Sequence, residues 1–436
     1  MSITLYPFQK KVMNQIKPFN RCAVYVDMGG GKTFIGSEKM KELGADTNLV
    51  ICQKSKVSDW VDHFRAYYPD LRVYDATSAR KDDKRAYEYG FWVNYRNGKV
   101  FQSVIIINYD LVWRRKELLQ LKDFTLMLDE SSLVQNHGAK RTRFILRMKP
   151  ANVILLSGTP TSGRYERLWT QMHLLGWPIS RKLYNQTYMI WDYIENRQTG
   201  YRIPVVKGYK NVKRLKRKMA EYGCVFMKSD EFGVDLPDQQ DIIVKVKASA
   251  GYKKFMRSRY LMTPDGAELV GDTSLTFRLY ARMLCGQYNK DKLAAAKNLI
   301  ESTEDRLIIF YNFTAEMEAL RDICNGMKRP VSLVNGSVKN LEAYEEYTDS
   351  VTLIQYQAGA YGLNLQKCRR VIYFTLPESS ELFGQSRKRI HRIGQDQTCL
   401  YYILMCKESI ETKILQTLRK RKDYTDRLFR KDFEDV

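Results

Sequence analysis

Residues 23–33 read AVYVDMGGGKT, and the helix-compatible stretch FIGSEKMKEL follows them. A short apolar, β-branched run thus enters a glycine turn that ends in a lysine and a threonine at the head of an amphipathic segment. Glycines let consecutive backbone amides turn toward phosphate oxygens, and the lysine and the hydroxyl can then neutralise phosphate charge and ligate Mg²⁺. The order of strand, glycine loop and helix predicts a phosphate-binding loop at the edge of an α/β sheet.

The predicted loop contributes five residues, which are Gly29, Gly30, Gly31, Lys32 and Thr33. We expect Lys32 to act on the β and γ phosphates of ATP and Thr33 to be a magnesium ligand. Val26 departs from the full pattern, which has glycine at that position, and a glycine-rich turn without a ligand is the alternative. The lysine-threonine pair at the start of a helix favours the phosphate site.

Short apolar runs recur along the chain, with helix-length amphipathic segments between them. The candidate strands lie at 23–26, 49–52, 104–107, 125–128 and 153–156, and again at 307–311, 351–356, 370–374 and 400–405. Parallel strands covered on both faces read as continuous hydrophobic runs. The rhythm therefore predicts an α/β protein with two halves, each a parallel sheet flanked by helices.

The strand rhythm is lost between about residues 169 and 290, where the chain becomes aromatic and basic. We predict a helical, basic-aromatic insertion at about 170–235, a strand at 242–246 that ends the first half, and a helical linker at about 250–300. The two domains are then expected at 1–247 and 248–436. The tail after Glu408 is expected to form one long charged helix.

The charge balance indicates a polyanionic partner. The chain has 72 Lys and Arg against 49 Asp and Glu, a net charge of +23, and such a surplus raises the local concentration of polyanions. The candidate contacts to a phosphate backbone are Lys213, Arg214, Lys216, Arg217 and Lys218. A solvated basic helix face is the alternative for this cluster, and a merely soluble basic protein is the alternative for the whole chain.

The eight cysteines are scattered, and no two are separated by only two residues. We therefore expect buried thiols in a reducing cytoplasm and no zinc cluster. No run approaches the roughly 18 apolar residues of a membrane helix, and the N-terminal residues lack a run of signal-peptide length. We expect a soluble monomer without a membrane partner.

A second apolar run, LMLDE, ends in the carboxylates Asp129 and Glu130. About one hundred residues after a phosphate loop, such a pair is suited to catalysis, with Asp129 holding magnesium through water and Glu130 orienting or deprotonating the attacking water. The next apolar run ends in LLSGTP, where Ser157 and Thr159 offer small hydroxyls that can sense the carboxylate pair. The two runs predict a catalytic edge of the first sheet.

The last third of the chain carries QSRKRIHRIGQ at 385–395. We predict that Arg389 and Arg392, three residues apart, lie on one face of a helix and stabilise developing charge on the γ-phosphate. A solvated arginine-rich helix is the alternative. Gly362 in the preceding loop and Gln385 are further candidate nucleotide contacts, and we expect His391 only to pack or to hydrogen-bond.

Taken in order, these motifs resemble the series of superfamily-two helicases of the Swi/Snf-type ATPase branch. The series is LYPFQ, GGGKT, VICQKSKVSDW, VIIINYDLV, LDESS, LLSGTP, LIIFYNFT, YQAGAYGLNL and QSRKRIHRIGQ. HRIGQ is the most specific element, because other branches usually end this motif differently. The resemblance covers nearly the whole chain and implies two tandem RecA-like domains, adenine recognition by Gln9, ATP and Mg²⁺ between the domains, and double-stranded DNA across both.

The chain departs from that branch at three places. Asp-Glu-Ser-Ser at 129–132 stands where Asp-Glu-Ala-His is usual, Ala360 replaces a glycine of the fifth motif, and FMKSDEF at 226–232 stands where linker arginines usually follow. The chain has no room for histone-reading modules and resembles the stripped-down form found in bacteria and their viruses.

The motifs predict an ATP-dependent DNA helicase or translocase that couples hydrolysis to movement along duplex DNA, with replication or repair proteins as further partners. An RNA-remodelling helicase stays open, because RNA is distinguished mainly by its 2′-hydroxyl. A non-catalytic DNA-binding recruitment protein also stays open, although the intact Lys32, Asp129 and Arg389 argue against it.

Overall fold

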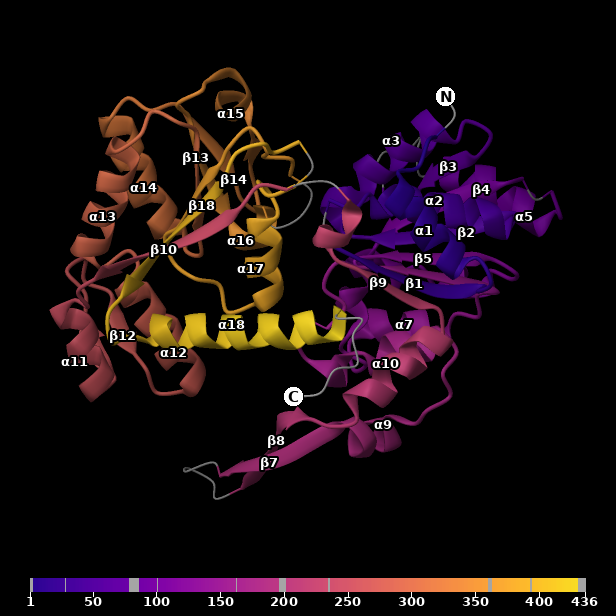
Figure 1. Ribbon diagram of the computed structural model, residues 1–436, viewed down its shortest axis with the longest axis horizontal. Coiled ribbons are helices and arrows are strands. Elements are labelled where there is room, and N and C mark those ends of the chain that lie inside the picture. The colour runs from indigo at the N-terminus through magenta and orange to yellow at the C-terminus, as the bar shows by residue number, and fades with distance from the viewer. Residues whose placement is uncertain are drawn as a thin grey trace. The chain divides into compact units, whose positions relative to one another are not determined.

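The computed structural model describes residues 3–429 except 28, 78–85, 100, 162, 196–200, 234, 235, 360–362 and 393, and the side chains of 86, 203, 359 and 421–429 are not described. The chain forms two compact units (Figure 1), which are Met1–Gly233 with Tyr424–Val436, and Val234–Asp423. We call them the first unit and the second unit.

The first unit is built on one parallel sheet. Within the described residues its strands lie in the order β3-β4-β2-β5-β6-β1-β9, and every neighbouring pair is parallel. The strands are β1 (Arg21–Val26), β2 (Thr47–Cys52), β3 (Arg72–Asp75), β4 (Ser103–Asn108), β5 (Thr125–Asp129), β6 (Asn152–Leu156) and β9 (Cys224–Met227). The five strands predicted for this half are confirmed as β1, β2, β4, β5 and β6, whereas β3 and β9 were not predicted.

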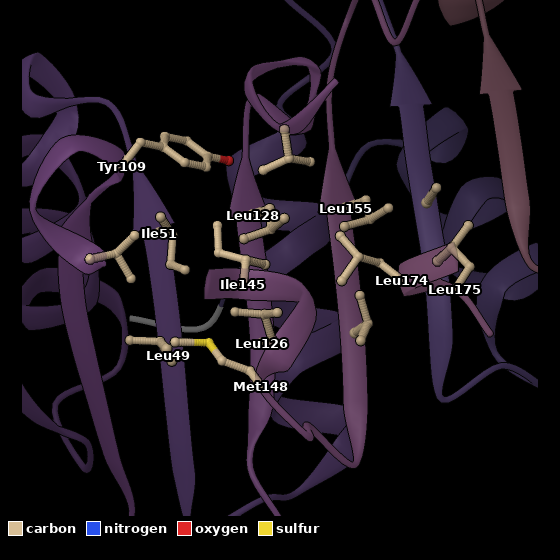
Figure 2. Close-up of a cluster of buried hydrophobic side chains, with 14 of the residues drawn as sticks. Leu49, Ile51, Tyr109, Leu126, Leu128, Ile145, Met148, Leu155, Leu174 and Leu175 are labelled. Carbon is tan, nitrogen blue, oxygen red and sulfur yellow. The ribbon is translucent and has the colours of Figure 1, made fainter. Parts of the chain in front are cut away.

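Helices and short turns connect these strands. The α-helices include α1 (Pro7–Ile16), α2 (Lys32–Leu43), α3 (Val57–Tyr67), α5 (Asn94–Arg96), α6 (Tyr109–Val112), α7 (Lys140–Arg147) and α8 (Trp169–Leu174). The short 3-10 helices are η1 (Lys54–Lys56), η3 (Lys116–Gln120), η4 (Ser131–Val134), η5 (Tyr165–Arg167) and η6 (Ser229–Phe232), and η2 (Ala86–Val93) is a π-helix. Leu49 and Ile51 of β2 pair in register with Leu126 and Leu128 of β5. Figure 2 shows these buried side chains with Ile145 of α7 in one cluster. Covered strands of this kind explain why the apolar runs located them.

The segment predicted as a helical insertion at about 170–235 is of mixed structure. After α8 it forms α9 (Arg181–Tyr188), the strands β7 (Met189–Glu195) and β8 (Arg202–Tyr209), α10 (Val212–Glu221) and then β9. β7 and β8 pair as an antiparallel hairpin, and β9 joins the first sheet beside β1. The prediction of a helical segment is therefore wrong for β7, β8 and β9, where aromatic and β-branched residues favour strands.

The second unit is built on a second, mostly parallel sheet. In the described part of the chain the strand order is β10-β18-β17-β13-β16-β14-β15, and β15 runs antiparallel to β14. The strands are β10 (Gln239–Val246), β13 (Leu307–Tyr311), β14 (Val331–Val334), β15 (Lys339–Asn340), β16 (Val351–Gln355), β17 (Arg370–Tyr373) and β18 (Cys399–Cys406). The four predicted strands of this half are confirmed as β13, β16, β17 and β18, and the two sheets are consistent with tandem RecA-like domains.

β10 corrects the predicted domain boundary. We expected Ile242–Val246 to end the first half, with domains at 1–247 and 248–436. Instead β10 pairs in parallel with β18 of the second sheet, and the first unit ends at Gly233 before the chain enters the second. A short apolar run predicts a strand but not its partner, which here lies near the end of the chain.

The segment expected to be a helical linker contains a hairpin. The elements are α11 (Ala250–Ser258), β11 (Tyr260–Met262), β12 (Glu268–Val270), α12 (Ser274–Cys285) and α13 (Lys290–Glu301). The turn sequence TPDG at 263–266, in which Gly266 has φ 83°, explains the interruption, because proline, aspartate and glycine favour tight turns. The prediction of continuous helix is therefore wrong between α11 and α12.

The remaining helices of the chain are α14 (Thr314–Gly326), α15 (Glu342–Glu346), α16 (Tyr356–Gly359), α17 (Ser380–Arg387) and α18 (Ile410–Phe429). α18 confirms the long tail helix, and a buried ion pair between Lys292 and Glu411 joins its first turn to α13. None of the described helices combines the length and the apolar character needed to span a bilayer.

Gly36 gives a test of how tightly α2 packs on the first sheet. A Cβ at this position would lie 2.8 Å from Leu156 Cδ1 and 2.9 Å from Met127 Sδ. We expect Gly36→Ala to lower the free energy of unfolding by about 1–3 kcal/mol, the usual cost of overpacking a core. Gly326→Ala, where an added Cβ meets nothing within 4 Å, is the control. Chemical denaturation measures both, and equal stabilities would contradict the tight packing of α2.

Candidate active site

The glycine loop joins β1 to α2, and two different constraints, backbone conformation and lack of space, require glycine in it. Gly29 and Gly31 have φ values of 86° and 64°, in the left-handed region that favours glycine. Gly30 is required by space, since a Cβ would lie 2.5 Å from Val26 Cγ1 and 2.7 Å from the ring of Phe232. The loop thus has the strand-loop-helix geometry that the sequence predicts.

Lys32 and Gln9 both contact the backbone of this loop. Lys32 Nζ donates to the carbonyl oxygens of Val26 at 2.8 Å and Asp27 at 3.2 Å. The buried Gln9 of α1 accepts a hydrogen bond from the Tyr6 amide at 2.9 Å, and its Nε2 donates to the Gly30 carbonyl at 3.3 Å. The predicted adenine-recognition residue therefore lies directly against the predicted phosphate loop.

Among the described residues, the side chains of Trp60, Ser132 and Ser157 donate to the carboxylates at the end of β5. Asp129 Oδ2 accepts a hydrogen bond from Trp60 Nε1 at 2.8 Å. Glu130 has φ 58°, and its Oε1 accepts from Ser132 Oγ at 2.7 Å and Ser157 Oγ at 2.6 Å. The contact expected between Ser157 and the carboxylate pair is confirmed, and the serine that departs from the Asp-Glu-Ala-His pattern orients the same glutamate.

Strand register brings the loop and the carboxylates to one edge of the sheet. Val24 of β1 is in register with Leu156 of β6, and Leu156 is in register with Asp129 of β5. Neighbouring strands lie about 4.8 Å apart, so Asp129 is about 10 Å across the sheet from Val24. The glycine loop starts a few residues beyond Val24 on the same side, and Lys32 and Thr33 therefore share this edge with Asp129.

α3 links the two predicted magnesium ligands. The Trp60 ring, which donates to Asp129, meets the His63 ring edge-on with centroids 5.6 Å apart. His63 Nε2 is 2.9 Å from Ser37 Oγ, and that hydroxyl donates to the Thr33 carbonyl at 2.9 Å. The sequence patterns assigned no role to Trp60 or His63, although Trp60 ends the motif VICQKSKVSDW and His63 follows it at helical spacing.

The arginine segment of the second unit is not a helix. α17 ends at Arg387, so the prediction that Arg389 and Arg392 share one helical face is wrong. The buried Arg389 donates to the carbonyls of Leu363 at 3.1 Å and Gln385 at 3.2 Å. These bonds to backbone oxygens hold the segment in a turn instead of extending α17.

Arg392 is half-buried and donates to the Asn364 side chain. Gln385 is fully buried, and its Oε1 has no hydrogen-bond partner among the described residues. Gly362, predicted to contact the nucleotide, lies outside the described residues. The arginine segment and the loop after Gly362 are thus brought together, with Arg392 nearer to solvent than Arg389.

Residues of HRIGQ fasten this segment to neighbouring backbone. Gln395 Nε2 donates to the carbonyls of Gln366 and Cys368, each at 3.0 Å. The His391 ring is 2.8 Å from the Pro237 carbonyl oxygen and 3.2 Å from Gln239 Nε2. The expectation that His391 packs and hydrogen-bonds is confirmed.

The basic cluster forms the outer face of α10. Leu215 and Met219 are buried on the inner face. Lys213, Arg214 and Arg217 are exposed, Lys216 and Lys218 are half-buried, and Lys218 pairs with Glu221 at 2.6 Å.

All eight cysteines are free and buried, as expected.

A parallel α/β sheet that carries a glycine-lysine-threonine loop and an aspartate-glutamate pair at one edge, followed by a second such sheet, is typical of two-sheet P-loop nucleoside triphosphatases. The SNF2-related domain matches residues 13–326, and the helicase conserved C-terminal domain matches residues 291–394. The chain belongs to the SNF2-related family, which confirms the resemblance inferred from the motifs.

The chain is similar in sequence to bacterial and eukaryotic proteins and matches an archaeal solved structure. The chain is 23% identical to YwqA of Bacillus subtilis, and the match covers 98% of this chain and 49% of YwqA. YwqA carries the provisional name of an ATP-dependent helicase/translocase. It is 22% identical to the DNA repair and recombination protein RAD26 of Saccharomyces cerevisiae, over 89% of this chain and 43% of RAD26. The Sulfolobus solfataricus SWI2/SNF2 ATPase core in complex with dsDNA matches at 19% identity and a TM-score of 0.44, over 97% of this chain and 92% of that chain. The chain thus spans less than half the length of YwqA and of RAD26.

His63 should make the first unit sensitive to acid. Burial lowers the pKa of His63 from 6.5 to about 4, so between these values the unfolded chain binds a proton that the folded chain does not. Stability from this group is present above pH 6.5 and is lost as the pH falls, by about 2 kcal/mol at pH 5. Denaturation of the native chain and of His63→Gln at pH 7 and pH 5 measures the difference. The exposed His173→Gln is the control, and parallel pH profiles for native and His63→Gln protein would refute the assignment.

Proposed function

We propose that this chain is a DNA-stimulated ATPase that moves along double-stranded DNA. The observation that carries the proposal is the single sheet edge on which the glycine loop, Lys32 and the Glu130 carboxylate meet, in a chain of the SNF2-related family. The net charge of +23 and the basic face of α10 support a nucleic-acid partner. Similarity to RAD26, a DNA repair and recombination protein, favours DNA over RNA.

In the first unit, each side chain has a role that its position permits. Lys32 exchanges its two carbonyl contacts for the β and γ phosphates, the loop amides bind phosphate oxygens, and Gln9 reads the adenine edge. Thr33 and Asp129 offer the oxygen donors that Mg²⁺ prefers, and the ion would neutralise charge on the phosphates. Glu130, oriented by two hydroxyl donors, positions or deprotonates water.

In the second unit, we assign different tasks to the two arginines. Arg392 is nearer to the surface and bonded to a neutral amide, which it can exchange for a phosphate oxygen at small cost. Arg389 is buried on two carbonyls and holds the turn that presents Arg392. Both contribute to stabilising charge on the γ-phosphate, Arg392 by contact and Arg389 chiefly by position.

Nucleic-acid-stimulated ATPase measurements test the proposal. We expect duplex DNA to raise turnover more than single-stranded DNA or RNA, and the native chain to displace the third strand of a triplex, which reports movement without unwinding. Lys32→Ala should lower stimulated turnover about 100-fold or more, because phosphate charge is no longer neutralised. Lys41→Ala, exposed on the same helix, is the matched control.

Each other outcome of these measurements selects a different function. Preferential stimulation by RNA would favour the RNA-remodelling helicase. Binding of DNA without turnover would favour the recruitment protein. Turnover at the native level in both Arg392→Ala and Arg389→Lys would refute the arginine assignments while leaving the rest of the proposal intact.

The basic face of α10 gives a separate prediction for DNA affinity. Replacing Lys213, Arg214, Lys216, Arg217 and Lys218 by glutamine should flatten the dependence of log Kd on log salt, by about 0.9 for each phosphate that the protein no longer neutralises. Lys116→Gln with Lys122→Gln, exposed elsewhere on the first unit, is the control. Fluorescence anisotropy over a salt series measures the slope, and an unchanged slope would make this face merely solvated.

A further inference from the structure

The β7-β8 hairpin exposes large hydrophobic side chains that the described residues of the first unit leave uncovered. Six of the seven residues of β7 are exposed. Among them are Ile190, Trp191, Tyr193 and Ile194, with exposed fractions of 43%, 41%, 62% and 59%. An isolated two-stranded ribbon is only marginally stable in water, and a concentrated apolar surface of this kind marks a binding site.

One face of the hairpin is aromatic. Trp191 lies opposite Val206 and Tyr193 lies opposite Pro204 in the antiparallel register. Residues two apart on a strand share a face, so these four side chains lie on one surface, which we call the ribbon face. Its Val206 is partly buried against the core of the first unit, and Trp191 and Tyr193 are its exposed rings. Asp192, which alternates to the other side, pairs with Lys207 at 3.4 Å.

The basic helix α10 lies at the base of the hairpin. The Lys210 amide donates to the Tyr188 carbonyl at 3.0 Å, and Asn211 Nδ2 donates to the Thr187 carbonyl at 2.8 Å. Burial raises the pKa of Tyr188, and the charges of Arg214 and Lys218 oppose that rise, so both cations lie near this hydroxyl. Figure 1 shows β7 and β8 extending away from the first sheet, with α9 and α10 at their base.

We propose that the ribbon face stacks on unpaired bases of a DNA strand whose backbone is held by α10. The neighbouring cations complement a phosphate backbone. The ribbon face offers rings and aliphatic carbon rather than the amide and guanidinium groups that read paired base edges, which favours stacking. Base-aromatic stacking is tolerant of sequence, because every base has a π-face. This inference rests on the proposed function and adds a contact to DNA at gaps, forks or strand ends.

The test compares two DNA ligands at one salt concentration. Fluorescence anisotropy measures Kd for a blunt duplex and for the same duplex with a single-stranded oligothymidine arm. In the double variant Trp191→Ala, Tyr193→Ala, we expect affinity for the forked ligand to fall about fivefold or more, as removal of one stacked base would cause, and affinity for the blunt duplex to stay unchanged. The conservative double variant Trp191→Phe, Tyr193→Phe should restore most of the fork affinity.

Controls separate stacking from misfolding and from other partners. Tyr89→Ala removes a ring that is 70% exposed on η2 and should leave both affinities unchanged, and thermal melts check that the hairpin variants fold. Quenching of Trp191 fluorescence by oligothymidine, taken as the difference between native protein and Trp191→Phe, is the second measurement. Equal fork affinity in native and alanine protein, or loss of self-association or of a protein partner instead, would overturn the inference.

The proposed function and this inference fail in different ways. A native chain whose ATPase is not stimulated by any DNA would refute the proposed function itself. A native chain with duplex-stimulated ATPase, whose alanine variant keeps native fork affinity, would refute the ribbon-face contact alone.

Discussion

The parallel register of β1, β6 and β5 is the constraint on which the candidate active-site edge depends. It aligns Val24, Leu156 and Asp129 in one row, and parallel strands deliver whatever follows them to a common edge. The glycine loop and the carboxylates are therefore neighbours although about one hundred residues separate them in sequence. Close packing maintains this arrangement, since Gly36 of α2 lies against Leu156 and Met127 with no space for a Cβ. A shift of α2 would move Lys32 and Thr33 relative to Asp129.

In the second unit, hydrogen bonds to backbone carbonyls hold the arginine segment in position. Arg389 donates to the carbonyls of Leu363 and Gln385, the Leu365 amide donates to the Arg389 carbonyl at 3.1 Å, and Gln395 donates to two further carbonyls. Buried carbonyl groups need hydrogen-bond donors. The polar side chains of Arg389 and Gln395, which the sequence alone suggests are free for chemistry, supply these donors and hold the turn in place. The different tasks that we propose for the buried Arg389 and the more exposed Arg392 rest on this use of the Arg389 side chain.

Sequence patterns predicted the strands that are covered on both faces, because burial alone imposes continuous apolar runs. They failed where the decisive information is a distant partner, as for β10, which pairs with β18. They failed again for β7, β8 and β9, whose strands lie within a segment read as basic and aromatic. In the candidate active site, motif spacing located the glycine loop and the carboxylates, which lie at one edge of the sheet. The Trp60 and His63 contacts could not be read from spacing, because they depend on how α3 is placed relative to Asp129 of β5 and Ser37 of α2 in the folded chain.

The serine at position 132, where the related motif usually has histidine, contributes to the orientation of Glu130. Ser132 and Ser157 donate to the same oxygen of Glu130, and the Ser157 hydroxyl in turn accepts from the Thr159 amide at 3.0 Å. A change in the position of Glu130 must therefore move or break a bond to the loop that follows β6. Among the described residues, the Ser157 hydroxyl links the Glu130 carboxylate to the loop that follows β6, and Ser132 adds a second donor to the same carboxylate oxygen. The departure at position 132 thus adds a hydroxyl donor to a carboxylate oxygen that Ser157 already orients.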